Sequence, residues 1–170
     1  MIRVLICLLS SFLLLQTASG ADDAYKLVQS KAADAIDKIP ASKVRLFLYS
    51  LNPHDYRVFD GKLPENSDQA FHRYPVLGGV EITSLEEKTN LLNAFTKGIR
   101  ESDGQVAACF NPRHGLRIVD GTVTNDFVIC FECLQVQAYG FSGGHDFLTS
   151  GSPSGTFNKV LDEYHIKKAN

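Results

Sequence analysis

The segment LRIVDGTVTNDFVICFECLQVQAYGF, residues 116–141, contains the clearest strand signals in the chain. Residues 116–119 and the long apolar run 127–141 are typical of strands, because both are rich in β-branched and aromatic residues. Asp120-Gly121 between them is the residue pair of a tight hairpin turn. We therefore predict an antiparallel hairpin, with 127–141 as one long strand and the best candidate for the centre of a sheet.

Strands and helices on both sides of this hairpin complete the predicted domain. Further strand signals cover residues 44–49, 74–83, 105–110 and 146–149. Apolar residues at helical spacing predict helices over 21–39, over 84–103 and after Pro153. The first helix is expected to dock on the sheet and not to serve as a partner-binding arm, because its apolar stripe is continuous. The predicted fold class is α+β: an antiparallel β-meander of four to five strands covered by amphipathic helices, in the order α-β-β-α-β-β-β-α.

Residues 1–20, MIRVLICLLSSFLLLQTASG, have the pattern of a signal peptide. Arg3 precedes an apolar run of 12 residues, and Ala18-Ser19-Gly20 fits the small-residue rule for cleavage. An apolar run of that length is too short to span a bilayer, which takes about 20 residues. We therefore expect a secreted or periplasmic protein with no membrane anchor after cleavage. Residues 21–170 are then expected to form a single α+β domain.

The charge pattern argues against a nucleic-acid partner. The chain has 17 Lys and Arg against 19 Asp and Glu, and its longest basic run is the Lys167-Lys168 pair. Domains that bind nucleic acid carry a basic patch or stripe instead. The sequence also contains no P-loop, dinucleotide-binding fingerprint or HExxH motif. The pattern favours a binding or scaffolding module over an enzyme, with an unidentified ligand or protein as its partner.

Two polar segments, CFNPRHG at residues 109–115 and VICFEC at residues 128–133, are expected to meet in space. If the two strands of the hairpin pair across the loop DGTVTND, Arg113 lies opposite Glu132, with His114 beside them. Arg113, His114 and Glu132 are therefore the predicted binding cluster.

Three cysteines remain after removal of the signal peptide: Cys109, Cys130 and Cys133. A disulfide is the common outcome in exported proteins. We expect it between Cys109 and one of the other two, because residues three apart on a continuous strand face opposite sides of the sheet. The alternative is a zinc site made by Cys109, His114, Cys130 and Cys133, since thiolate and imidazole are ligands that Zn²⁺ prefers. A further alternative leaves the cysteines unbridged as small apolar residues in the core.

The segment GFSGG, residues 140–144, matches the G-x-S-x-G pattern of a nucleophile elbow, with His145 or His114 as the base for Ser142. An elbow needs a strand, a sharp turn and then a helix, whereas the following HDFLTSG is short and strand-like. A hydrolase is therefore a distant alternative. A thiol-redox protein is an equally distant alternative, since the apolar neighbours of the cysteines argue against a reactive thiolate.

The motifs CFNPRHG and VICFECLQV, with HRYPVLGGVEIT and IRESDG upstream, resemble those of an uncharacterised family of exported bacterial proteins. The resemblance runs from about Lys43 to the end of the chain. It implies export and a single domain, and it carries no known activity. It also implies that the five residues of the two segments belong together: Arg113, His114, Cys130, Glu132 and Cys133.

Overall fold

The structure is a computed structural model that describes residues 24–53, 66–67 and 70–169. The predicted signal peptide, residues 1–20, lies outside the described residues. An N-terminal helix covers residues 24–37. The elements after it are β1 (Arg45–Leu51), β2 (Asn66–Ser67), β3 (Ala70–Phe71), β4 (Tyr74–Ile82), α2 (Leu85–Arg100), β5 (His114–Asp120), β6 (Val123–Cys130), β7 (Gln135–Tyr139), β8 (Asp146–Leu148) and α3 (Ser154–Glu163).

The strands form one antiparallel sheet in the order β2-β3-β4-β1-β5-β6-β7-β8. The α+β class and the antiparallel sheet are therefore confirmed. The described residues contain eight strands, which differs from the predicted four to five and from the order α-β-β-α-β-β-β-α. The chain runs as a meander from β5 to β8, but β1 lies between β4 and β5.

Three local features account for this difference. The predicted strand 127–141 is divided into β6 and β7 by a turn at residues 131–134. Leu134 in this turn has a φ of 60°. Leucine rarely adopts this left-handed conformation, so its presence in the sequence does not predict a turn. β2 and β3 form an additional short hairpin. Residues 105–110, predicted as a strand, are irregular.

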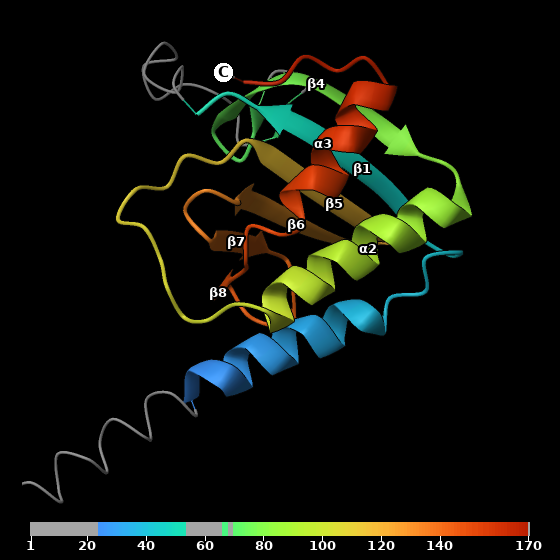
Figure 1. Ribbon diagram of the computed structural model, residues 1–170. Coiled ribbons are helices and arrows are strands. Elements are labelled where there is room, and N and C mark those ends of the chain that lie inside the picture. Colours follow the sequence, from blue (N-terminus) through green and yellow to red (C-terminus); the bar gives the residue numbers. More distant parts are fainter. Residues whose placement is uncertain (1–23, 54–65, 68–69, 170) are drawn as a thin grey trace, which may run out of the picture.

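β1 and β5 occupy the middle of the sheet, so the prediction that the 127–141 run is central was wrong. β1 pairs with β4 on one side and with β5 on the other. The reason is the path of α2, which carries the chain from β4 across the sheet to the far side of β1 (Figure 1). β5 consequently has a strand on each side, and its first residue, His114, is buried.

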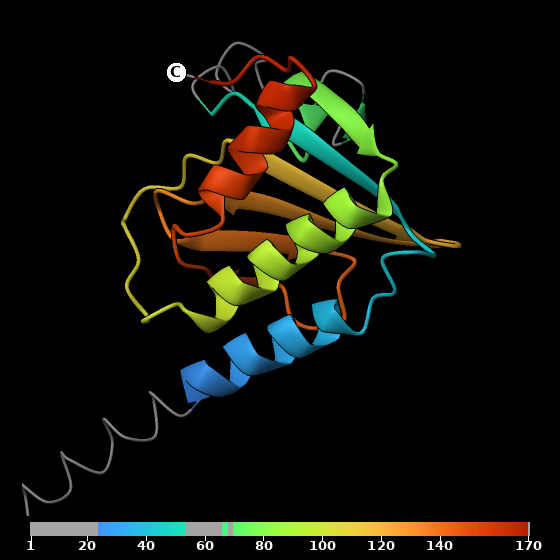
Figure 2. The same cartoon turned by 45° about the vertical axis from the view of Figure 1, so that its right-hand side comes forward.

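The N-terminal helix, α2 and α3 cover the same face of the sheet (Figures 1 and 2). Ser84 caps the start of α2, and its Oγ accepts a hydrogen bond from the Glu87 N–H at 3.4 Å. The N-terminal helix lies beside α2, and Arg100 of α2 donates to Asp34 and Asp37 of that helix at 2.8 and 2.7 Å. Docking of this helix on its own domain agrees with the expectation from its apolar stripe.

The main core lies between the helices and this face of the sheet. Side chains with no exposed surface come from every layer: Ile36, Leu46, Leu48, Phe95, Leu116, Phe127 and Phe157. Burial of one such side chain contributes about 1.5–3 kcal/mol to folding. Because Phe157 anchors α3 in this core, the next residue, Asn158, is held beside the start of β5.

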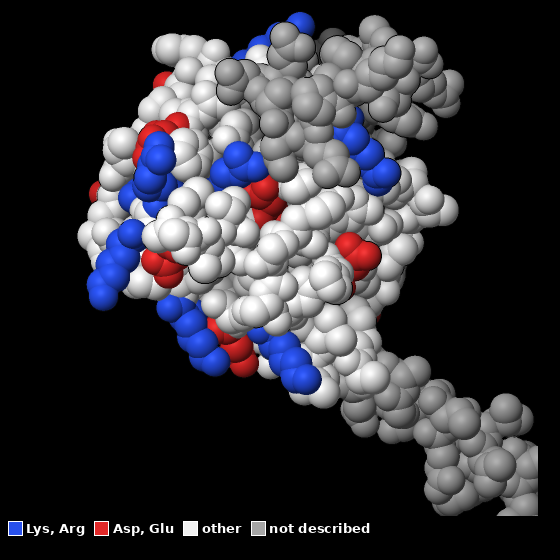
Figure 3. All heavy atoms as spheres, turned by 180° about the vertical axis from the view of Figure 1, so that it is seen from behind, with Lys and Arg blue, Asp and Glu red and all other residues white. Residues whose placement is uncertain are grey.

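The opposite face of the sheet carries a smaller apolar cluster made by Leu51, Phe71, Tyr74 and Val128. The Phe71 ring lies directly on β5 at Gly115, where an added Cβ would be 2.8 Å from the ring. On the molecular surface seen from behind, Lys and Arg are interspersed with Asp and Glu (Figure 3). This face is therefore a mixture of aromatic and charged side chains without a single dominant sign of charge.

Candidate functional site

The β5–β6 hairpin brings the two predicted polar segments together. His114 pairs with Ile129, whereas the predicted pairing of Arg113 with Glu132 would place it opposite Phe131. The register is therefore two residues from the predicted one. Arg113 therefore precedes β5, and Glu132 lies in the turn that follows β6. Arg113 Nη1 nevertheless donates to Glu132 Oε1. The turn, and not the strand ladder, makes this ion pair.

Cys130 and Cys133 form a disulfide, with their Sγ atoms 2.04 Å apart. The expectation that they face opposite sides of a strand was wrong, and so was the expected bridge from Cys109. β6 ends at Cys130, and the turn that follows brings the two Cα atoms to 5.1 Å, within the range for a bridge. Both cysteines are buried. The Cys133 N–H donates to Cys130 Sγ at 3.1 Å.

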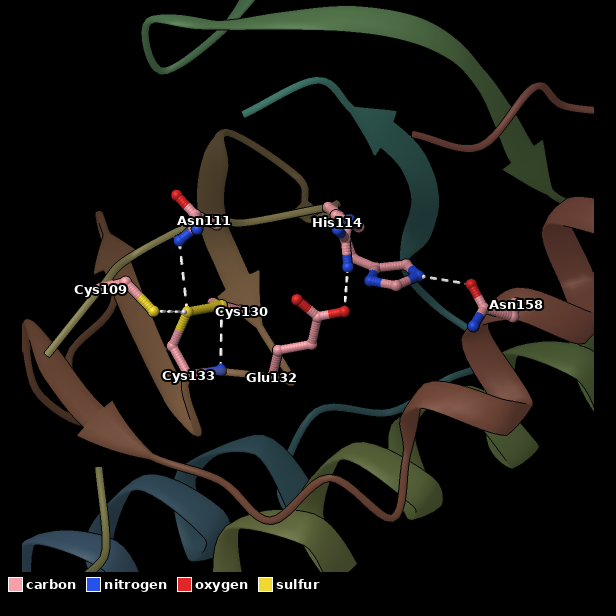
Figure 4. A network of polar contacts seen from close by, with 8 residues as sticks. Cys109, Asn111, His114, Cys130, Glu132, Cys133 and Asn158 are labelled. Atoms are coloured by element: carbon pink, nitrogen blue, oxygen red, sulfur yellow. Dashed lines mark hydrogen bonds and ion pairs between the residues drawn. A yellow bond between two sulfur atoms is a disulfide. The ribbon is translucent and has the colours of Figure 1, made fainter. Parts of the chain in front are cut away.

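Cys109 is the free cysteine of the described residues, and it is exposed. Its Sγ lies 3.8 Å from Cys133 Sγ, and the Asn111 N–H donates to the same Cys133 sulfur at 3.2 Å. Figure 4 shows Cys109, Asn111 and the bridge on one side of Glu132, and His114 with Asn158 on the other. The structure thus gathers three sulfurs at one place.

The four predicted zinc ligands do not converge in this structure. Two of the sulfurs are joined to each other, and His114 directs its ring toward Asn158 (Figure 4). Within the part of the chain that the structure describes, no group of three or more His, Cys, Asp and Glu side chains is arranged to hold a metal ion.

His114 is buried, with 5% of its surface exposed, and its Nε2 lies 3.0 Å from Asn158 Oδ1. Because an amide oxygen is an acceptor, this contact assigns the ring hydrogen to Nε2 and leaves a bare lone pair on Nδ1. Burial lowers the pKa of His114 from 6.5 to about 4, so the ring is neutral at physiological pH. Among the described residues Nδ1 has no hydrogen-bond partner.

A cavity of about 270 Å³ lies beside this ring. Arg113, Glu132 and Asn111 line it from the polar segments, while Ser154 and Asn158 of α3 and Lys168 of the C-terminal segment line it from the helix side. Two cationic groups therefore face one carboxylate. Lys168 is also paired with Asp162 at 2.7 Å.

The first turn of α3 is also part of the wall of this cavity. No side chain caps the helix at Pro153, and the first turn has no acidic residue. The N–H groups at the start of a helix carry partial positive charge and favour anions. The His114 cavity, defined by the residues above, therefore combines two cations and a helix N-terminus, and the unpaired acceptor of His114 is buried beside it.

A second polar network, on the opposite face of the sheet, was not found from the sequence. Arg117 donates to both carboxylate oxygens of Asp126 on β6, each at 2.7 Å. His72 Nε2 lies 2.7 Å from Oδ2, the oxygen that also accepts from Arg117 Nη2. The His72 side chain is only 11% exposed, and its ring stacks on Tyr139 with centroids 3.8 Å apart. Burial raises the pKa of Asp126, but the hydrogen bonds from Arg117 and His72 outweigh it and leave the pKa below its ordinary value.

The sequence contains one signal for this network and lacks a second. Arg117 and Asp126 are cross-strand partners in the hairpin, so the correct register would have paired them. His72 and Arg73 have positive φ values of 45° and 67° and form the two-residue connection between β3 and β4. Such connections usually contain Asn or Gly, and neither is present to mark this one.

The segment at residues 140–144 is a turn between two strands. Gly140 and Gly144 have φ values of 68° and 136°, and β8 follows directly. Since no helix follows Ser142, the nucleophile elbow that a hydrolase would need is not formed.

Comparisons with known proteins add nothing to this geometry. No family model, no curated protein and no solved structure matches the chain. No helix among the described residues is long and apolar enough to cross a bilayer.

Proposed function

We propose that the protein is a binding module that takes a small hydroxycarboxylate in the His114 cavity. The observation that carries this proposal is the bare Nδ1 of a buried, neutral imidazole. A buried acceptor without a donor costs about 1–3 kcal/mol, and buried polar groups in folded proteins nearly always have a partner. A ligand hydroxyl is a donor of the required kind, and because Nδ1 is itself buried, the hydroxyl reaches it through a small shift of the His114 ring or of the cavity wall.

The rest of the cavity supports an anionic ligand. Arg113 and Lys168 both line the cavity, each beside a carboxylate partner, Glu132 and Asp162, and the uncapped start of α3 lies on the same space. A carboxylate gains charge-assisted hydrogen bonds from such groups. The volume of about 270 Å³ lies just under the range of pockets for drug-sized molecules, which suits a ligand of a few carbon atoms.

The proposal includes action outside the cytoplasm, secreted or periplasmic, and membership in the exported bacterial family that the motifs resemble. A structural disulfide is compatible with an oxidising compartment. The residues that carry the resemblance, Arg113, His114 and Glu132, are also those that line the proposed binding cavity.

Malate and succinate test this proposal, because they differ by a single hydroxyl group. We expect malate to bind about fivefold more tightly in calorimetric titrations, since one additional hydrogen bond contributes about 1 kcal/mol. His114→Phe should abolish the preference, and His145→Phe, which changes an exposed histidine elsewhere, should retain it. Equal affinity for the two acids, no binding of either, or a preference that survives in His114→Phe would contradict the proposal.

Zinc binding by the reduced cysteines is the second candidate function, favoured by the 3.8 Å between Cys109 Sγ and Cys133 Sγ. Two thiolates bound tetrahedrally to Zn²⁺ at about 2.3 Å are separated by about that distance. After reduction and addition of Zn²⁺, elemental analysis of the desalted protein should find stoichiometric zinc, and Cys109→Ser should lower it. Zinc-free wild-type protein after the same treatment would rule this function out.

A further inference from the structure

We propose that Cys109 exchanges with the Cys130–Cys133 disulfide, so that the bridge moves between Cys130–Cys133 and Cys109–Cys133. The inference is independent of the ligand of the His114 cavity. It rests on the 3.8 Å between Cys109 Sγ and Cys133 Sγ and on the hydrogen bonds that hold the two segments together.

The segment that carries Cys109 is fixed to the Cys133 turn on both sides of the cysteine. Before it, the Ala107 N–H donates to the Cys133 carbonyl at 3.2 Å, and Gln135 Nε2 donates to the Ala107 carbonyl at 2.7 Å. After it, the Asn111 N–H donates to Cys133 Sγ at 3.2 Å. Cys109 is therefore held next to Cys133 although its segment has no regular secondary structure.

The exchange is balanced within the chain. Cys109 loses its proton to solvent, and its thiolate attacks Cys133 Sγ to form a Cys109–Cys133 bond. The Cys130–Cys133 bond breaks, and the electron pair leaves on Cys130, which takes up a proton from solvent. No oxidant or reductant is consumed, because one disulfide and one thiol are present before and after.

The structure also supplies a donor for the leaving group. The Cys133 N–H points at Cys130 Sγ at 3.1 Å. A hydrogen bond to a thiolate is stronger than one to a neutral sulfur, and exchange is faster when the leaving thiolate is stabilised. Because Cys109 is exposed while Cys130 is buried, the exchange moves the free thiol from the surface to the interior.

The positions of the free thiol in the wild-type protein test the exchange. The protein is incubated at about pH 8.5, the ordinary pKa of a thiol, then unfolded in acid and labelled with a maleimide. Trypsin cuts after Arg113, and a glutamate-specific protease cuts after Glu132, so the three cysteines fall on separate peptides. We expect label on both Cys109 and Cys130. Label confined to Cys109 at every time point would overturn the proposal.

Two variants separate exchange from incomplete oxidation. Cys109→Ser should show no label on Cys130, because the attacking thiol is gone; label there would mean simple loss of the bridge and would overturn the proposal. Cys130→Ser in a glutathione buffer should form the Cys109–Cys133 bridge and take up no label. Two labelled cysteines in folded Cys130→Ser would overturn it as well, and the wild-type experiment decides the matter if this variant does not fold.

Discussion

Two histidines on opposite faces of the sheet differ in the groups that surround their rings. His72 contacts the buried carboxylate of Asp126, which is itself held by two bonds from Arg117. His114 is also buried, but its Nε2 bonds to the neutral amide of Asn158, and its buried Nδ1 has no partner beside a cavity. We call the first network closed, because both oxygens of its carboxylate accept hydrogen bonds, and it fastens the β3–β4 hairpin to the sheet. We call the second network open, because it leaves a buried acceptor without a donor.

The largest expected effect is on the closed network. Asp126→Ala leaves Arg117 and His72 without their shared carboxylate, and loss of one partner of a buried ion pair costs about 3–5 kcal/mol. We expect a loss of about 3 kcal/mol, near the lower end, because the Arg117 side chain is 25% exposed. Urea denaturation measures it. Asp146→Ala, at an exposed position, serves as the control, and equal stability of the two variants would show that the network does not fasten the fold.

The two networks should also respond to acid in different pH ranges. The pKa of His114 is about 4 in the folded chain and 6.5 when unperturbed, so the unfolded state binds a proton first. Stability therefore falls as pH drops from about 6.5 to about 4, by about 3 kcal/mol in all. Asp126 has a lowered pKa, so its contribution is complete above its ordinary pKa of 3.8 and is lost below it.

His114→Phe isolates the first of these ranges. Urea denaturation of wild type and of this variant is followed across the pH range. As the pH falls below 6.5, the wild type should lose free energy of unfolding relative to the variant. A difference that stays constant down to pH 4 would mean that His114 does not become protonated on unfolding.

A matched pair of substitutions tests the comparison at neutral pH. His72→Phe removes a partner of a buried carboxylate and should cost about 1–3 kcal/mol. His114→Phe removes the unpaired Nδ1 together with the hydrogen bond from Nε2 to Asn158, a half-buried residue of the cavity wall. The ring stays packed against Phe131 and Phe157. Relief of the unpaired acceptor offsets the lost hydrogen bond, so the cost should stay below about 1 kcal/mol. Thermal and urea unfolding of both variants measure the difference. A larger loss for His114→Phe would reverse the assignment of the closed and open networks.

The smallest expected effect concerns Glu132, whose side chain is 65% exposed in its pair with Arg113. Surface ion pairs contribute about 0–1 kcal/mol, so Glu132→Gln should change the free energy of unfolding by less than about 1 kcal/mol. Urea denaturation of Glu132→Gln and of the wild type measures this change. A loss as large as that of Asp126→Ala would make the pair part of the structural framework and not of the open site.

Features of the fold and of the site were predictable from the sequence where neighbouring residues determine them. They were not predictable where residues far apart in the chain determine them. The start of α2 was predictable, because Ser84 and Glu87 form a local signal. The turn at residues 131–134 was not, because no Gly or Pro marks it, and the mistaken long strand then hid the Cys130–Cys133 bridge. The two polar segments were predicted to meet. The state of His114 was not predictable, since it depends on Asn158, 44 residues away on α3.

The nitrogen resonances of the His114 ring, measured by NMR near neutral pH with and without malate, test the central claim most directly. We expect a neutral ring with its hydrogen on Nε2, facing Asn158, and a bare Nδ1 whose resonance moves on addition of malate and not of succinate. A hydrogen on Nδ1 in the free protein, or an Nδ1 resonance that malate leaves unchanged, would contradict the proposed binding role of His114.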